Sequence, residues 1–157
     1  MANVSQVKDL GAYCTTFYAS ASQTAAGAPT TVVAGGTPDG TKVTGDTIDT
    51  AGLYASGIFQ ISYLTALASA ETLSFAIEYQ ESDDNSSWDT AVAIQASTVC
   101  ATGSGNVGGM VQSDITLYDK KRYIRFNITP ALSASSSDTA GYGAVLTAGG
   151  ADYVPQT

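Results

Sequence analysis

The chain has no histidine, which limits the chemistry that its side chains can perform. Histidine is the commonest general base near neutral pH, completes Ser-His and Cys-His nucleophile systems, and is a usual zinc ligand. A pair of carboxylates could still hydrolyse a glycosidic bond, and the available glutamates are Glu71, Glu78 and Glu81. Glu78 and Glu81 fall on or beside the polar side of an expected strand, where a solvated charge is the ordinary explanation. We therefore predict that the chain is not an enzyme.

Residues 103–108 read Gly-Ser-Gly-Asn-Val-Gly, which fits the spelling of a dinucleotide-binding fingerprint. That motif needs a following helix and an acidic residue about 20 positions further on. The pattern after residue 109 is that of a strand instead. A glycine-rich hairpin loop over residues 102–109 is the favoured interpretation, and no cofactor is predicted.

A second pattern places oxygen-bearing side chains at alternate positions: Asp83, Asn85, Ser87 and Asp89. This resembles half of a calcium loop, but the turn glycine and the bidentate acid that complete such a site are missing. A polar hairpin tip explains these residues better than a metal site, so no metal is predicted.

The charge of the chain argues against several kinds of partner. Fourteen acidic residues against six basic ones give a net charge of −8, and only 13% of the residues are charged. A negative field repels phosphate backbones and anionic lipid, so neither nucleic acid nor a membrane surface is an expected partner. No apolar run approaches the roughly 20 residues that a membrane-spanning helix needs.

Cys14 and Cys100 are the only cysteines, and their separation fits no metal-binding motif. Residues 1–11 show no signal-peptide pattern, so nothing indicates an oxidising compartment. We predict two free, buried thiols in a protein made in a reducing cytoplasm.

Residues 71–89 contain the clearest secondary-structure signal. Apolar side chains occupy every second position at Leu73, Phe75, Ile77 and Tyr79, which predicts a strand with one buried face. Short polar residues over 82–87 predict a hairpin tip. Trp88 then opens the next apolar stretch. It could be a stacking platform for a sugar ring, but a position plugging one end of the core is favoured.

The remaining chain alternates short apolar segments with turn residues, and no amphipathic helix is evident. Residues 58–64 carry bulk on both faces, which indicates a central strand, and another strand is expected over 42–48. We predict an all-β antiparallel β-sandwich, with a jelly roll of eight or so strands as the expected topology. The predicted organisation is an N-terminal arm at 1–11, the sandwich at 12–147 and a C-terminal arm at 148–157. Frayed ends and ends that order against a neighbour remain open alternatives for the arms.

Basic residues gather at 120–125, where Lys120, Lys121 and Arg122 precede a strand that contains Arg125. A solvated turn is favoured over a docking patch for the first three. Arg125 alternates with apolar residues and is expected to make a paired contact on an outer face. Nine tyrosines exceed the needs of a small core, and tyrosine is enriched at protein interfaces, which favours a protein that binds other proteins.

The strand over 73–80 that runs into Glu-Ser-Asp-Asp-Asn-Ser-Ser-Trp at 81–88 resembles the small capsid decoration, or cement, proteins of tailed bacteriophages. The Lys-Lys-Arg-Tyr-Ile-Arg-Phe segment at 120–126 and the background rich in small residues add to the likeness, which spans residues 58–146. The same hairpin also resembles discoidin-like carbohydrate-binding domains. Those often tie their ends with a disulfide, which the spacing of Cys14 and Cys100 does not fit well.

The phage resemblance implies a virion protein on the outside of an icosahedral head, made in the cytoplasm of a host bacterium. As a dimer or trimer it would bridge copies of the major capsid protein. The candidate contacts are Tyr13, Tyr18, Lys120, Lys121, Arg122, Arg125 and Tyr153. The candidate outward-facing hairpin tip comprises Asp83, Asp84, Asn85 and Trp88. The alternatives are a carbohydrate- or receptor-binding jelly roll on a virion appendage, and a tail or tail-tube component.

Overall fold

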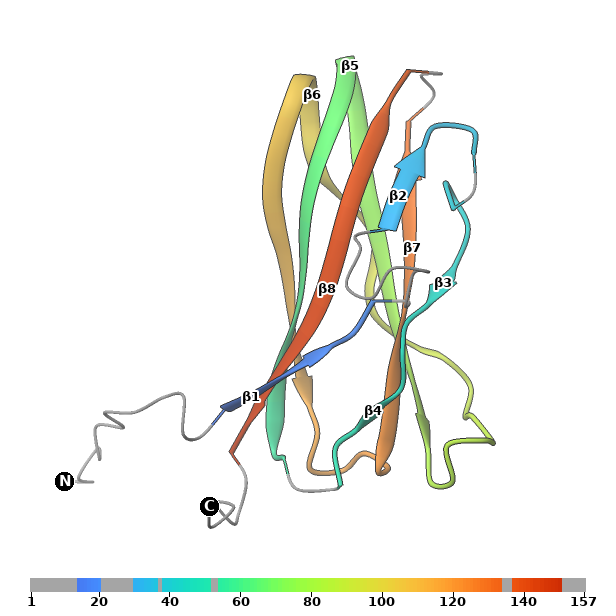
Figure 1. Cartoon of the computed structure of the whole chain (residues 1–157), viewed down its shortest axis with the longest axis vertical. Helices are drawn as coiled ribbons and strands as arrows, with labels where there is room; N and C mark the ends of the chain where they lie inside the picture. Colours follow the sequence, from blue (N-terminus) through green and yellow to red (C-terminus); the bar gives the residue numbers. More distant parts are fainter. Residues whose placement is uncertain (1–13, 21–29, 37, 52–53, 134–136, 151–157) are drawn as a thin grey trace, which may run out of the picture.

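The computed structural model describes residues 14–20, 30–36, 38–51, 54–133 and 137–150. These residues form eight strands: β1 (Cys14–Tyr18), β2 (Thr30–Val33), β3 (Val43–Thr44), β4 (Ile48–Asp49), β5 (Ser56–Ser82), β6 (Val92–Thr116), β7 (Tyr123–Leu132) and β8 (Thr139–Gly149) (Figure 1). Every recorded pairing between them is antiparallel. The predicted all-β antiparallel fold is confirmed. Within the described ranges, no helix has the length and apolar character required to cross a membrane.

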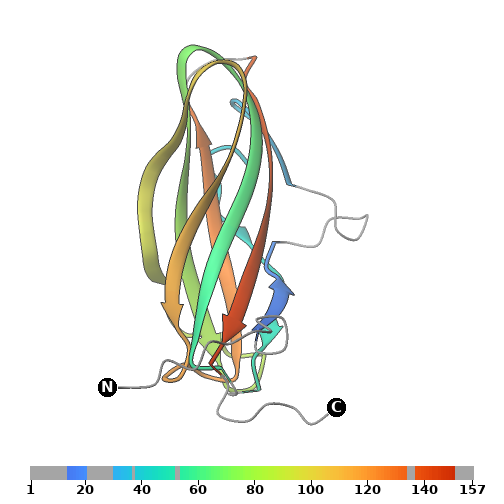
Figure 2. The same ribbon diagram turned by 90° about the vertical axis from the view of Figure 1, so that its left-hand side faces the viewer.

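The fold is built on one very long hairpin that turns back on itself. β5 has 27 residues and β6 has 25, and they pair from Ser56 opposite Thr116 to Tyr79 opposite Val92. Figure 2 shows the two strands rising together, turning over at one end of the molecule and returning. At the turn-over, Ala70 and Gly105 adopt the left-handed backbone conformation, with φ of 66° and 89°. Pairing resumes beyond the turn, with Glu71 opposite Gly103.

This continuity corrects two sequence-based predictions. The strands expected at 58–64 and 73–80 are halves of β5, and the loop expected at 102–109 lies inside β6. The physical reason is that the paired strands β5 and β6 bend together. Each continues to satisfy the backbone hydrogen-bonding groups of the other on both sides of the bend, so neither has to leave the ladder.

The folded hairpin divides the molecule into two layers. Sheet I contains β1, β2, β8, residues 56–67 of β5 and residues 105–116 of β6. Sheet II contains residues 92–103 of β6, residues 71–82 of β5, β7, β3 and β4. β5 therefore belongs to both layers, with β8 beside its first half and β7 beside its second.

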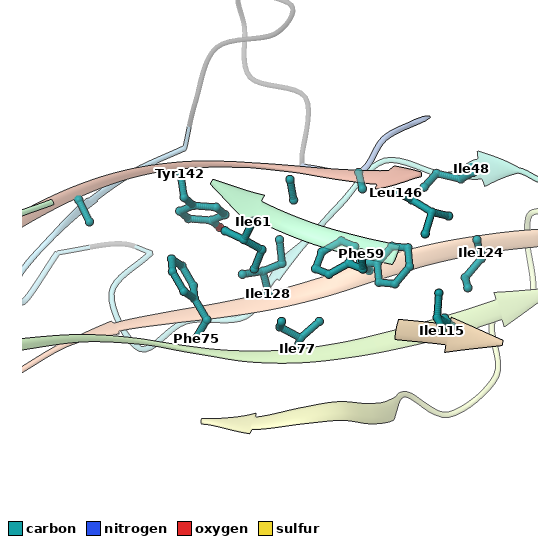
Figure 3. Packing of buried hydrophobic residues seen from close by; sticks show 14 of the residues in the cluster. Ile48, Phe59, Ile61, Phe75, Ile77, Ile115, Ile124, Ile128, Tyr142 and Leu146 are labelled. Atoms are coloured by element: carbon teal, nitrogen blue, oxygen red, sulfur yellow. The ribbon is translucent and has the colours of Figure 1, made fainter. Parts of the chain in front are cut away.

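The core lies between these layers, where alternate side chains of β5, β7 and β8 are buried (Figure 3). Phe59 of sheet I stacks on Phe126 of sheet II, with ring centroids 4.1 Å apart and an interplanar angle of 18°. Phe75 of sheet II and Tyr142 of sheet I meet edge to face, with ring centroids 5.3 Å apart and an interplanar angle of 67°. One stacked and one edge-to-face aromatic pair therefore join the two sheets.

Two predicted boundaries differ from the structure. The strand expected over 42–48 is split into β3 and β4 at Gly45, whose amide donates to the carbonyl of Phe126 at 2.7 Å. A Cβ at Gly45 would lie 2.1 Å from the carbonyl oxygen of Ala19, so only glycine permits this close approach. β8 extends through Gly149, two residues into the expected C-terminal arm. The N-terminal arm at 1–11 lies outside the described residues.

Candidate interaction surfaces

The hairpin tip between β5 and β6 is organised around the Asp84 carboxylate. It accepts hydrogen bonds from the backbone amides of Ser86 and Ser87 at 2.8 and 2.7 Å and from the Ser82 hydroxyl at 3.0 Å. These donors hold the pKa of Asp84 well below its usual range. The side chains of Asp83, Asp84 and Asn85 are exposed at this tip. Its central carboxylate is committed to shaping the loop, and no metal-binding group of three or more acidic or sulfur ligands occurs among the described residues.

Trp88 lies on the outer surface of sheet II and not in the core, so the favoured prediction of a core plug is wrong. The guanidinium carbon of Arg125 sits 4.0 Å from the centroid of the Trp88 ring. Arg125 also donates from Nε and Nη2 to Oε1 of Gln80, at 3.1 and 3.0 Å. The expectation of a paired outer-face contact for Arg125 is confirmed. The physical reason for the error is that β6 begins only at Val92, which leaves Trp88 in the preceding connection, beside β7.

Each lysine and arginine in the described part of the chain has an acidic or polar partner within it. Lys121 bridges Asp83 and Asp89 at 3.1 and 2.9 Å, and Arg122 donates to both carboxylate oxygens of Asp49 at 3.0 and 2.7 Å. The remaining basic contacts are Lys120 with Asp119, Lys42 with Glu78, and Arg125 with Gln80. The pairs made by Lys121 and Arg122 join separate connections at one end of the molecule. This arrangement supports the turn interpretation of residues 120–122 over a free basic docking patch.

The three glutamates considered for catalysis also have partners inside the chain. Glu71 accepts from the Ser133 hydroxyl, Glu78 pairs with Lys42, and Glu81 accepts from the amide of Lys121 at 2.9 Å. No two of these carboxylates share a partner.

Both cysteines are free, as predicted, but each is only partly buried, whereas burial was expected. Burial raises the pKa of the Cys100 thiol, so the nucleophilic thiolate is disfavoured there. Its carbonyl accepts a hydrogen bond from the Tyr63 hydroxyl at 2.6 Å, which links the two layers at the side closed by β6.

The outer face of sheet I differs from all these surfaces because it is nearly free of charge. Residues opposite one another in antiparallel strands point to the same face, so the register defines its members. Across the sheet it runs from β1 through β8 and β5 to β6, as in the row Tyr18, Val145, Gln60 and Gln112. On the portions of β1, β8, β5 and β6 that make up this face, Asp114 is the one charged residue.

Large apolar side chains are exposed on this outer face of sheet I. Leu64 is 64% exposed, Met110 is 56% exposed and Ile58 is 39% exposed, and Tyr18 and Val33 are exposed at the far side. Isolated exposed apolar residues are ordinary, but a nearly uncharged face that gathers several of them is typical of an interaction surface.

The same face is hollowed beside Leu64. A shallow depression of about 450 Å³ is lined by Ser62, Leu64, Gly141 and Gly143, among others. A Cβ at Gly141 or Gly143 would meet nothing within 4 Å, so packing within the described residues does not require glycine at either position. Glycine weakens a strand interior, and one use for it there is to let another backbone or a ligand come close. A second depression of about 560 Å³, lined in part by Cys14, Ile58 and Asp114, lies further along the same face.

The sequence-based contact candidates are therefore scattered. Tyr18 lies on the outer face of sheet I, whereas residues 120–122 and Arg125 lie elsewhere and are paired within the chain. Tyr13 and Tyr153 lie outside the described residues. Leu64 and Met110 were missed as candidates. The signal that could have found Leu64 is the bulk on both faces of 58–64, which was interpreted only as a sign of a central strand.

No protein-family model matches the chain, and no curated sequence does either. The fold does have structural counterparts. A chain of the T13 particle of infectious bursal disease virus is similar over 87% of this chain and 31% of its own length, with 12% identity and a TM-score of 0.52. The Gt strain of that virus gives 13% identity and a TM-score of 0.51, covering 90% of this chain and 33% of the other. The fold is a jelly roll.

The jelly roll spans about a third of the length of these viral chains, and at such low identity the likeness concerns the fold alone. A xylanase of Clostridium thermocellum, crystallised as CBM22-1 and GH10 modules with xylohexaose, is also similar. It has 10% identity and a TM-score of 0.46, over 92% of this chain and 27% of the other.

Proposed function

We propose that the chain is a structural virion protein that binds the outside of an icosahedral phage head and stabilises it by bridging neighbouring major capsid proteins. The observation that carries this proposal is the outer face of sheet I, which is nearly uncharged, exposes Leu64, Met110 and Ile58, and is hollowed at two glycines. The proposed location is the capsid exterior, after synthesis in the bacterial cytoplasm. Neither nucleic acid nor a membrane is a proposed partner, because the net charge is −8.

The binding free energy available from one such face is small, which suits a protein that binds through several copies at once. Fully burying one leucine side chain contributes about 1.5–3 kcal/mol, so one contact of this size is weak. A dimer or trimer that touches several capsid subunits at once gains effective concentration, and its avidity can exceed the single-site affinity by roughly 10² to 10⁴. Because such a protein binds only the assembled shell, its binding opposes rupture of the head.

Binding of the purified protein to mature heads of the virus that encodes it tests this proposal directly. Wild type should bind saturably, at a stoichiometry set by icosahedral symmetry. Leu64→Asp should weaken binding by roughly 10- to 100-fold, because the removed apolar contact is worth about 1.5–3 kcal/mol. Val99→Asp is the matched control. Val99 is also an exposed apolar residue, at 56%, but it lies on the part of β6 in sheet II, away from the proposed binding face. Absence of saturable binding by folded wild type would refute the proposal.

A carbohydrate- or receptor-binding module on a virion appendage is the second candidate. The observation that favours it is a partly exposed Trp88 beside the polar side chains of Gln80 and Arg125. One side of the indole ring is already covered by the guanidinium, which leaves one face for a sugar. A glycan array with wild type and Trp88→Ala discriminates: loss of sugar binding in a folded variant would support this function, and no binding by wild type would remove it.

A further inference from the structure

Among the residues that the structure describes, β6 has one edge without a strand partner. In the part of the chain that the structure describes, β6 pairs only with β5, although it is 25 residues long and takes part in both sheets. Unpaired edge strands offer a row of free backbone donors and acceptors to any other strand. Natural proteins usually protect such edges with lysine, proline or β-bulges.

The two halves of this edge are protected to different degrees. Between Leu73 and Glu78 of β5, the pairing with the first half of β6 shifts register three times, which marks bulges or irregular pairing. From Ser56 opposite Thr116 to Leu67 opposite Gly105, the pairing has no shift. Residues 106–116 contain neither lysine nor proline. The regular half of the edge, in sheet I, therefore lacks these three forms of protection.

The side chains of residues 106–116 suit pairing with an identical strand. Asp114 is the one charged residue among them, so two copies meet little like-charge repulsion in a chain whose net charge is −8. In an antiparallel pair centred on Val111, residue 114 of each copy lies opposite residue 108 of the other. The two Asp114 carboxylates are thereby kept apart. Antiparallel pairing about a two-fold axis also makes the same edge complementary to itself.

The geometry points to a homodimer in which residues 106–116 of β6 pair edge to edge, antiparallel, with the same residues of a second copy. Pairing of this length forms about ten main-chain hydrogen bonds, the number typical of a specific interface. Sheet I then continues from one copy into the other, and the two nearly uncharged outer faces form one surface. This inference rests on the proposed function in one respect, since it names the contact that makes the head-binding unit bivalent.

Sedimentation equilibrium of the full chain over a wide concentration range tests the dimer. The edge variant is Met110→Lys with Gln112→Lys, two exposed, outward-facing positions. In the pair centred on Val111 these lysines lie directly opposite one another, and like charges placed so cost several kcal/mol. The dimer dissociation constant should rise by roughly 100-fold or more. The matched control is Ser62→Lys with Gln60→Lys, because these β5 residues lie opposite Met110 and Gln112 on the same face but away from the edge.

The inference is supported if wild type and the control dimerise while the folded edge variant is monomeric. Hydrogen exchange of wild type provides a measurement that needs no variant: amides within 106–116 should gain protection as protein concentration rises. A monomeric wild type, or an edge variant that still dimerises, would overturn the inference. So would protection of 106–116 that appears only when heads are added, because a capsid strand would then occupy the edge. A monomer that binds heads refutes the dimer alone, and a dimer that ignores heads refutes the proposed function alone.

Discussion

Phe59 and Phe126 offer the sharpest test of how the two layers are joined. Both side chains are fully buried, and their rings stack 4.1 Å apart across the interior. Replacing either by alanine would cost about 3–5 kcal/mol, a large part of the total stability of about 5–15 kcal/mol expected for a domain. Leucine is therefore the better substitution, with an expected cost of about 1 kcal/mol for each single change.

A double-mutant cycle isolates the stacking contact from the general loss of burial. Wild type, the variants Phe59→Leu and Phe126→Leu, and the double variant are unfolded in urea. Their free energies of unfolding are compared, provided that the slope of free energy against urea concentration is the same for all four proteins. The stacked pair predicts a coupling energy of about 0.5–1.5 kcal/mol.

The control cycle pairs Phe126→Leu with Phe75→Leu. Phe75 lies four residues along β5 from Tyr79, the register partner of Phe126, so the two sites are about 13 Å apart. Their effects should add to within about 0.5 kcal/mol. If the first cycle is additive as well, the layers are not joined through this ring pair and the packing described for the core is wrong.

Three further outcomes are expected. Gly45→Ala should destabilise the fold by about 2 kcal/mol or more in thermal or urea unfolding, since its Cβ would lie 2.1 Å from a backbone oxygen, whereas Gly141→Ala, with open space around it, should cause no loss. Arg125→Ala should shift the fluorescence of the single tryptophan, Trp88, to longer wavelength and lower stability by about 0.5–1 kcal/mol; an unchanged spectrum would contradict the stacking. Folding lowers the pKa of Asp84, so its stabilising contribution is present above the unfolded pKa of about 4 and is lost as pH falls below it. The free energy of unfolding of Asp84→Asn should therefore fall less steeply with pH below about 4 than that of wild type. An equal pH dependence in the two proteins would show that Asp84 is not the source of this loss.

The strands themselves could be predicted from sequence because burial on one face leaves a two-residue period. Leu73, Phe75 and Ile77 are buried as that period requires. The continuity of β5 was harder to predict from the sequence. Alternating apolar and polar residues do not show whether a strand keeps its hydrogen-bonded partner where it bends. One signal was present nonetheless: residues 65–72 contain no glycine or proline, the usual marks of a break between strands.

The interaction surfaces were harder to predict because they depend on contacts between distant segments. Arg122 is neutralised by Asp49, which lies 73 positions away in sequence. Without that contact, residues 120–125 look like a basic patch. The nearly uncharged face of sheet I arises in the same way, since the alternation of β5 shows which side chains share a face but does not show which other strands extend it.

The strand shared by both layers has a mechanical consequence for a protein proposed to hold a pressurised shell together. In a sandwich made of separate sheets, a shearing force on one layer is resisted by the side chains between them. Here the covalent backbone of β5 passes from one layer into the other, so part of that load is carried along a peptide chain. Sliding one layer past the other would first have to unzip a ladder in which β5 is held by neighbours on both sides.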